Sequence, residues 1–158
     1  MSIKTSVPVL FAGVFVALLL AATAGAAQLS QRESSLLTAV NRARTAHDLR
    51  PLAVDRRLMR IARSHSSILL RRDVFTHGDF AARVSRSGAR GPLFGENLAW
   101  GTGSRVSATS VVRSWLQSPG HRRNLLRPGF SRIGLGTATG RFAGHNGATV
   151  VTADFAGH

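Results

Sequence analysis

The chain has 158 residues and a formal charge of +14, because it contains 21 Lys and Arg but only seven Asp and Glu. It has no cysteine, which excludes disulfides, thiolate metal sites and a cysteine nucleophile. The charge favours anionic partners, such as phospholipid head groups or acidic polymers of a cell envelope. The arginines are spread over most segments, however, and this pattern is also typical of ordinary surface charge.

The first 26 residues have the pattern of a cleavable secretory signal peptide. Lys4 provides a positive start, an apolar run follows over residues 9–22, and residues 24–26 (Ala-Gly-Ala) offer a cleavage site. The rival interpretation is an uncleaved membrane anchor, but a spanning helix needs about 20 apolar residues and this run is shorter. No cysteine follows the run, which excludes a lipid-anchored lipoprotein.

We therefore expect residues 27–158 to form a single secreted domain, periplasmic or extracellular, with no transmembrane span after cleavage. About 131 residues can bury one hydrophobic core without disulfides. Export also argues against nucleic acid as the natural partner.

Three helices are predicted in the first half of this domain. A capping-box pattern begins at Ser30, and apolar residues at helical spacing follow over roughly residues 31–47. Asp55 is a candidate N-cap for a second amphipathic helix that fades near residue 72. A short third helix is expected over residues 80–87, where Gly88 stops it.

The second half of the domain is expected to alternate strands with one more helix. Residues 93–100 indicate a strand, and a helix capped by Ser104 should end at Pro119-Gly120. Two further strands are expected at residues 133–137 and 148–155, and the short glycine-rich turn between them favours antiparallel pairing. Gly134 and Gly136 predict a close approach by another backbone. The chain is thus expected to be a layered α/β domain.

The six histidines are not equal candidates for chemistry. His65 lies on the apolar face of the second helix, where a hydrogen-bonded core residue is the usual explanation. Three others are expected to be solvated: His47, His145 and His158. His77 and His121 are expected in loops beside glycines, and Glu96 stands in an otherwise uncharged strand, where a buried carboxylate needs a partner.

Two imidazoles and one carboxylate can hold a divalent metal such as Zn²⁺ with an open position for water. The same three groups can equally form a metal-free hydrogen-bonded cluster that ties loops to the sheet. No H-x-x-x-H pattern is present, and spacing alone does not select His77, Glu96 and His121.

Ordered motifs along almost the whole predicted domain point to a known family. The blocks are VNR (40–42) with LRPL (49–52), FTH (75–77), GENLA (95–99), WLQSPGHRRNLL (115–126), IGLG (133–136) and TADF (152–155). This ordered set resembles the CAP superfamily, also called the SCP-like domain, in its short bacterial form. The resemblance implies an α-β-α sandwich, with helices flanking a small, mainly antiparallel sheet.

The resemblance also implies a central cleft lined by two histidines and two glutamates. His77, Glu96 and His121 match three of these positions, whereas Ser118 stands where the second glutamate would fall. A single carboxylate cannot work as an acid/base pair of the two-carboxylate kind. Three more residues match family positions and are interpreted as structural support: Arg83, Asn97, which can bond loop backbone, and Asn124, which can cap the turn after His121. Trp100 and Trp115 are expected in the core.

Three functions follow from these features. The leading hypothesis is a secreted CAP-domain binding module at or outside the cell envelope, whose His77/Glu96/His121 cleft takes a metal or a small ligand. The second is a metal-assisted hydrolase, in which the two histidines bind the ion and Glu96 is either third ligand or general base. The third is attachment through the arginines to anionic lipid or envelope polymer, with a small hydrophobic ligand held beside the helices.

Overall fold

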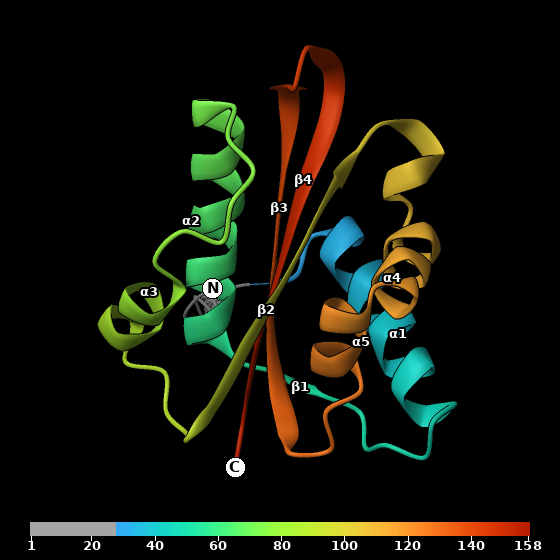
Figure 1. Ribbon diagram of the computed structural model, residues 1–158, viewed down its shortest axis with the longest axis vertical. Helices are drawn as coiled ribbons and strands as arrows, with labels where there is room; N and C mark the ends of the chain where they lie inside the picture. Colours follow the sequence, from blue (N-terminus) through green and yellow to red (C-terminus); the bar gives the residue numbers. More distant parts are fainter. Residues whose placement is uncertain (1–27) are drawn as a thin grey trace, which may run out of the picture.

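The computed structural model describes residues 28–158, so the predicted signal peptide over residues 1–26 lies outside the described residues. A four-stranded sheet forms the middle layer (Figure 1), in the order β1 (Ala53–Val54), β3 (Phe130–Phe142), β4 (His145–Gly157) and β2 (Leu93–Gly101). All neighbouring strands are antiparallel except β1 and β3. The predicted pairing of the last two strands is confirmed.

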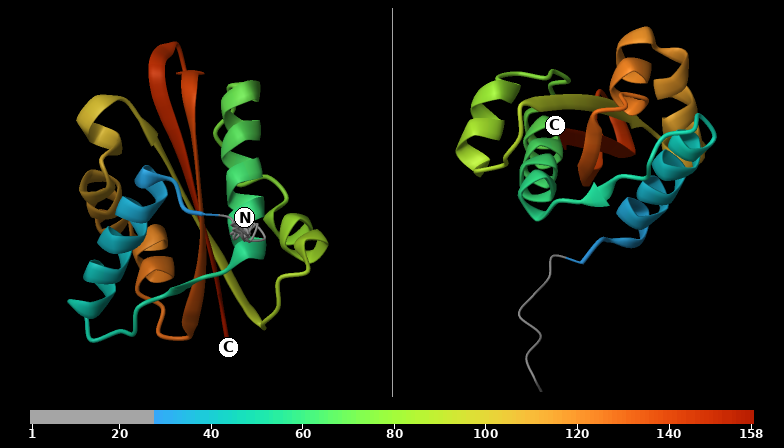
Figure 2. Two further views of the ribbon diagram at one scale, coloured as in Figure 1. Left: turned by 180° about the vertical axis from the view of Figure 1, so that it is seen from behind. Right: turned by 90° about the horizontal axis from the view of Figure 1, so that it is seen from below.

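Helices cover both faces of this sheet. Two helices lie on one side, α2 (Arg56–Arg72) and α3 (Phe80–Ser87), and three lie on the other, α1 (Gln31–Thr45), α4 (Ala108–Gln117) and α5 (Pro119–Leu125). Seen from below, the three layers separate clearly (Figure 2). The α-β-α sandwich is therefore confirmed. No helix in residues 28–158 is long and apolar enough to cross a membrane.

The predicted helix starts in the first half are present. Ser30 and Glu33 form the expected capping box of α1, and Asp55 caps α2 by accepting hydrogen bonds from two backbone amides. Glu33 also binds Arg63 of α2, with 2.6 Å between Oε2 and Nη2. Burial by itself would raise the pKa of Glu33, but hydrogen bonds from Arg63 and Ser30 outweigh it and lower the pKa.

Two boundaries in the second half differ from the prediction. Ser104 does not cap α4, because a 3₁₀ turn (Gly103–Val106) comes first and Ser107 accepts the capping hydrogen bond from Ser110. The second difference is at Pro119, which follows the end of α4 but also begins another helix. It opens α5 as its first residue, where a missing N–H is harmless, and so places His121 on a helix instead of in a loop.

The sheet carries a hydrophobic cluster on each face. The larger one, against α1 and α4, includes Trp115, whose indole Nε1 donates to Leu98 O at 2.9 Å. On the α2 face, the predicted close approach is confirmed: a Cβ on Gly136 would lie 2.2 Å from the carbonyl carbon of Ala62. Trp100 was wrongly expected in the core, because it lies near the end of the outermost strand and is 37% exposed.

A buried arginine stabilises the helical layer that contains α1 and α5. Arg44 of α1 is 1% exposed and has no acidic partner among the described residues. Its guanidinium instead donates to four backbone carbonyls, those of Arg50, Leu125, Arg127 and Phe130, at 2.9 to 3.1 Å. These bonds hold the chain after α5 against α1 and thereby fix the position of α5.

Candidate functional site

The outermost strand β2 places consecutive side chains on opposite faces of the sheet. Glu96 faces α2 and α3, where it meets the side chain of Arg83. Asn97 faces α5 and donates to its backbone. Because β2 is one of the two edge strands, groups on its two faces can approach each other around this edge, and the predicted site residues lie here.

Glu96 is the centre of the site and is only 5% exposed. Its Oε1 lies 2.7 Å from Nδ1 of His77, and its Oε2 accepts a hydrogen bond from Nη2 of Arg83. Arg83 also donates from Nη1 to the carbonyl oxygen of His77 at 2.6 Å, so that these three residues are linked in a closed set of hydrogen bonds. Since an ionised carboxylate can only accept, Nδ1 of His77 carries a proton, and in the neutral ring Nε2 is then the free nitrogen.

This arrangement orients an exposed imidazole on a buried support. The His77 side chain is 55% exposed, whereas that of Glu96 is 2% exposed. A carboxylate that accepts from one ring nitrogen fixes the tautomer and the direction of the other, as the second shell of a metal-binding histidine does. His77 therefore presents a preset Nε2 lone pair to solvent.

His65 supports the loop that carries His77. It is buried, as predicted, and its Nε2 lies 3.1 Å from the carbonyl oxygen of Thr76 and 3.8 Å from Oε2 of Glu96. Burial lowers the pKa of His65, which favours its neutral form. The sequence analysis placed His65 in the core but missed that it borders the site.

A second carboxyl group lies beside Glu96 and was also missed. Asp154 of β4 is directly opposite Glu96 in the antiparallel register and is completely buried. Neither of its carboxyl oxygens has a hydrogen-bond partner within residues 28–158. Burial, together with the nearby charge of Glu96, raises the pKa of Asp154 well above its ordinary range. A lone acid in an otherwise apolar strand was the available signal, but its partner depended on the strand register.

His121 belongs to the opposite side of β2. Its carbonyl oxygen accepts from Nδ2 of Asn97 at 3.0 Å, and Asn124 donates to Glu96 O at 3.0 Å and to Asn97 Oδ1 at 3.1 Å. Asn124 thus binds the strand and does not cap the turn after His121. Burial, and next the charge of His77, lowers the pKa of His121. Ser118 is the N-cap residue of α5, and its side chain makes no capping hydrogen bond.

These positions limit how a metal ion could be held. Within residues 28–158, no group of three or more His, Cys, Asp or Glu side chains is placed to hold one. Each oxygen of Glu96 already has a close partner, His77 at Oε1 and the cationic Arg83 at Oε2. The imidazoles of His77 and His121 are less buried than Glu96, whose present contacts orient the His77 ring.

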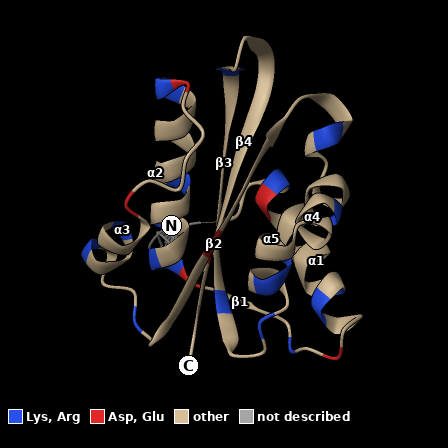
Figure 3. Ribbon diagram, viewed as in Figure 1, with Lys and Arg blue, Asp and Glu red and all other residues tan. Residues whose placement is uncertain are grey.

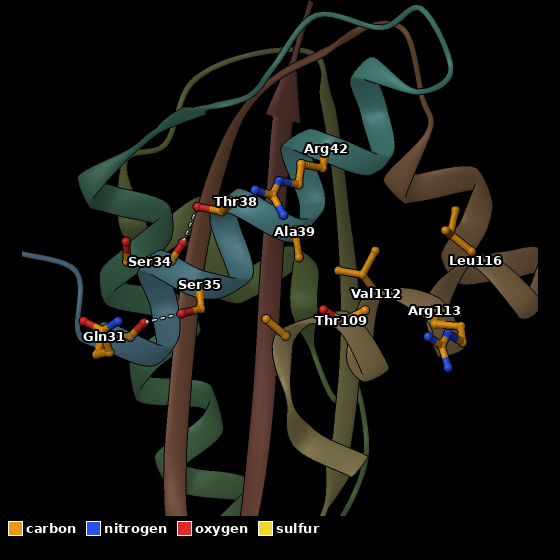
Figure 4. Close-up of a pocket in the computed structure, with 11 residues that line it drawn as sticks. Gln31, Ser34, Ser35, Thr38, Ala39, Arg42, Thr109, Val112, Arg113 and Leu116 are labelled. Carbon is orange, nitrogen blue, oxygen red and sulfur yellow. Dashed lines mark hydrogen bonds between the residues drawn. The ribbon is translucent and has the colours of Figure 1, made fainter. Parts of the chain in front are cut away.

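A separate groove of about 660 Å³ lies between α1 and α4, away from Glu96 (Figure 4). Its sides carry the hydroxyls of Ser34, Ser35 and Thr38 from α1, and Val112 contributes apolar surface from α4. Ser34 and Thr38 are joined by a hydrogen bond of 3.1 Å from the Thr38 hydroxyl to the Ser34 carbonyl.

Comparison with known proteins agrees with this architecture. Residues 37–155 match the Cysteine-rich secretory protein family. The chain is 30% identical over 119 residues to the uncharacterized protein YkwD of Bacillus subtilis, a match that covers 72% of this chain and 45% of that protein. A second B. subtilis relative, the uncharacterized membrane protein YlbC, is 28% identical over 109 residues, which are 66% of this chain and 31% of that protein. This chain thus spans less than half the length of both relatives.

Solved structures show the same fold. An extracellular protein with an SCP domain from Bacillus anthracis matches with a TM-score of 0.66 and 24% identity, over 83% of this chain and 45% of that one. An outer surface protein of Borrelia burgdorferi matches with a TM-score of 0.67 and 21% identity, over 83% of this chain and 96% of that one. The ordered motifs, the sandwich and the family match agree: the chain belongs to the Cysteine-rich secretory protein (CAP) family.

Proposed function

We propose that the protein is exported and acts outside the cytoplasm as a binding module, with the imidazoles of His77 and His121 as its recognition groups. The signal-like pattern of residues 1–26 supports export. Solved relatives described as extracellular or as an outer surface protein support the same location. Recovery of the protein outside the cytoplasm, starting at Ala27 or Gln28 by N-terminal sequencing, is the expected result; intact protein retained inside would contradict export.

The observation that carries the binding role is the engagement of both Glu96 oxygens. His77 contacts Oε1 and Arg83 contacts Oε2, which supports a positioning role for this buried carboxylate. The ligand-facing atom is Nε2 of His77, held in one direction by this buried support. Such a site suits a divalent ion such as Zn²⁺, or a small polar ligand that donates a hydrogen bond to the imidazole.

A zinc titration by calorimetry tests this proposal on matched variants. One ion should bind per chain, His77→Ala and His121→Ala should each remove binding, and Glu96→Gln should weaken it by about 10- to 100-fold through loss of ring orientation. His158→Ala is the control, because this histidine is exposed at the end of the chain. Absence of heat, together with no zinc-induced rise in melting temperature, would eliminate the metal and leave only the small-ligand form of the proposal.

The alternative, a metal-assisted hydrolase, requires Glu96 to bind the ion or to take a proton from a bound water. Either role would require Glu96, whose side chain is 2% exposed, to give up or share the oxygens that now contact His77 and Arg83. Hydrolysis of cell-wall material by the wild-type protein, lost in folded His121→Ala and Glu96→Gln variants, would establish the alternative over the binding module.

A further inference from the structure

An exposed apolar patch lies at the end of the molecule that carries the β3–β4 turn. We define the aromatic end as Val74, Phe75 and Trp100, whose exposed fractions are 49%, 45% and 37%. These are three of the four large hydrophobic residues that are exposed within residues 28–158; the fourth, Val54, is on β1. The clustering matters because single exposed hydrophobic residues are ordinary, whereas contiguous ones mark contact surfaces.

Buried Phe142 connects the two aromatic members of the aromatic end. Its ring packs edge-on against Phe75, with centroids 6.4 Å apart, and against Trp100, with centroids 5.3 Å apart. The segment that carries Val74 and Phe75 is fixed to the β3–β4 turn, because the backbone N–H of Ala143 donates to the carboxylate of Asp73. The aromatic end is therefore a supported surface and not a set of independent side chains.

Arginines surround this patch. Arg72 lines a cavity of about 330 Å³ together with Val74, and Arg105 lines a depression of about 340 Å³ together with Trp100. Arg141 precedes Phe142 on β3, near the turn. Figure 3 shows blue segments at the end of α2, beside the β3–β4 turn and in the turn before α4, all at this end of the molecule, with a red segment beside α2. Arg72, Arg105 and Arg141 outnumber the single carboxylate of Asp73, which leaves this end with a net positive charge.

We propose that the aromatic end docks the protein on the surface of an anionic phospholipid bilayer. Exposed aromatic and aliphatic side chains can enter the interfacial region, while the surrounding arginines attract anionic head groups. A soluble polyanion would satisfy the arginines but would leave Val74 and Phe75 in water. The combination of both features favours a bilayer over an anionic polymer.

Docking here would also place the candidate site near the membrane. Phe75 and His77 belong to one loop, in which Thr76 is held by His65 and His77 is held by Glu96. The inference goes beyond the proposed binding function and does not depend on it, since no member of the aromatic end contributes a hydrogen bond to Glu96.

Vesicle flotation tests the inference on a chain that begins at Gln28. This chain keeps every strand and both hydrophobic clusters, and it lacks the apolar run of residues 9–22, which could insert by itself. Vesicles of phosphatidylglycerol mixed with phosphatidylcholine should bind it, and pure phosphatidylcholine vesicles should bind it far more weakly. The tryptophan emission should shift to the blue through Trp100, because Trp115 is buried already.

Variants then separate insertion from general charge attraction. Phe75→Ser should weaken binding by about tenfold and Arg141→Gln by about fivefold. The matched controls, Val54→Ser and Arg113→Gln, alter an exposed valine and an exposed arginine elsewhere and should bind as the wild type does. Equal melting temperatures show that each variant is folded.

Three results would overturn docking by the aromatic end: no vesicle binding, equal binding to neutral vesicles, or a Phe75→Ser variant that binds like Val54→Ser while Arg141→Gln is weakened. The last result would indicate attraction of any polyanion, and binding to long-chain polyphosphate should then match binding to vesicles. His121→Ala, which alters α5 and not the loop of Phe75, should leave vesicle binding unchanged, so failure of zinc binding and failure of membrane docking remain distinguishable.

Discussion

Replacing Arg83 by methionine tests whether the site depends on one buried ionic contact. Arg83 supplies the cation beside two carboxyl groups, that of Glu96, which it contacts, and that of Asp154, which lies opposite Glu96. The Met side chain keeps much of the apolar stem while removing the charge and the hydrogen bonds. Glu96 would then keep His77 as its hydrogen-bond partner and the buried His65, 3.8 Å from Oε2, as a neighbour.

The expected loss in the free energy of unfolding is about 3 kcal/mol. Breaking a buried ion pair by removing one partner costs about 3–5 kcal/mol, because the other charge stays buried without compensation. The lower end applies here, since the Arg83 side chain is 15% exposed and water can partly replace it. Such a loss is a large fraction of the about 5–15 kcal/mol that stabilises a typical domain.

Urea denaturation of a double-mutant cycle measures this directly. Arg83→Met should be much less stable than the control Arg86→Met, which removes an exposed arginine of the same helix. Adding Glu96→Gln to Arg83→Met should recover part of the loss, because the uncompensated charge is then gone. A loss below about 1 kcal/mol, or additive effects of the two substitutions, would refute the reasoning.

Three further changes have defined outcomes. Glu33→Gln should lower the free energy of unfolding by about 1–2 kcal/mol at pH 7. Because the pKa of Glu33 is lowered in the folded state, the stability that the Glu33 carboxylate contributes is complete above the ordinary pKa of 4.5 and disappears as pH falls. Urea curves of the variant and the wild type should therefore converge in acid. Arg44→Met leaves four carbonyls without their donor and should cost at least about 3 kcal/mol, whereas Arg42→Met, on the exposed side of the same helix, should cost less than about 0.5 kcal/mol in the same assay. Gly136→Ala forces a Cβ against the α2 backbone and should lower the melting temperature by at least about 10 °C in a thermal scan, and a normal melting temperature would contradict that close approach.

Much of the fold could be predicted because its signals are local. The capping box at Ser30 and the N-cap at Asp55 act within one helical turn. The approach of α2 to the sheet is also visible locally, since glycine alone fits at position 136. The start of α4 was misplaced because Ser104 and Ser107 are both acceptable N-caps, and the choice depends on how the 3₁₀ turn packs.

Less of the candidate site than of the fold could be predicted from the sequence. The resemblance identified His77, Glu96 and His121. It could not show that Arg83 donates a hydrogen bond to the Glu96 carboxylate, or that Asp154 lies opposite Glu96 on the neighbouring strand. Those facts depend on the register between β2 and β4 and on the packing of α3. Trp100 was misplaced for the same kind of reason, because α2 covers the inner strands and leaves the end of the edge strand exposed.

The tautomer of His77 is the most direct test of the central claim that Glu96 holds this imidazole with Nε2 free for a ligand. Long-range ¹H–¹⁵N NMR at a pH where the ring is neutral should show the proton on Nδ1, and Glu96→Gln should weaken this preference. Added zinc should then shift the ¹⁵N signals of His77 and His121 together. A His77 that carries its proton on Nε2 in the wild-type protein would contradict the account.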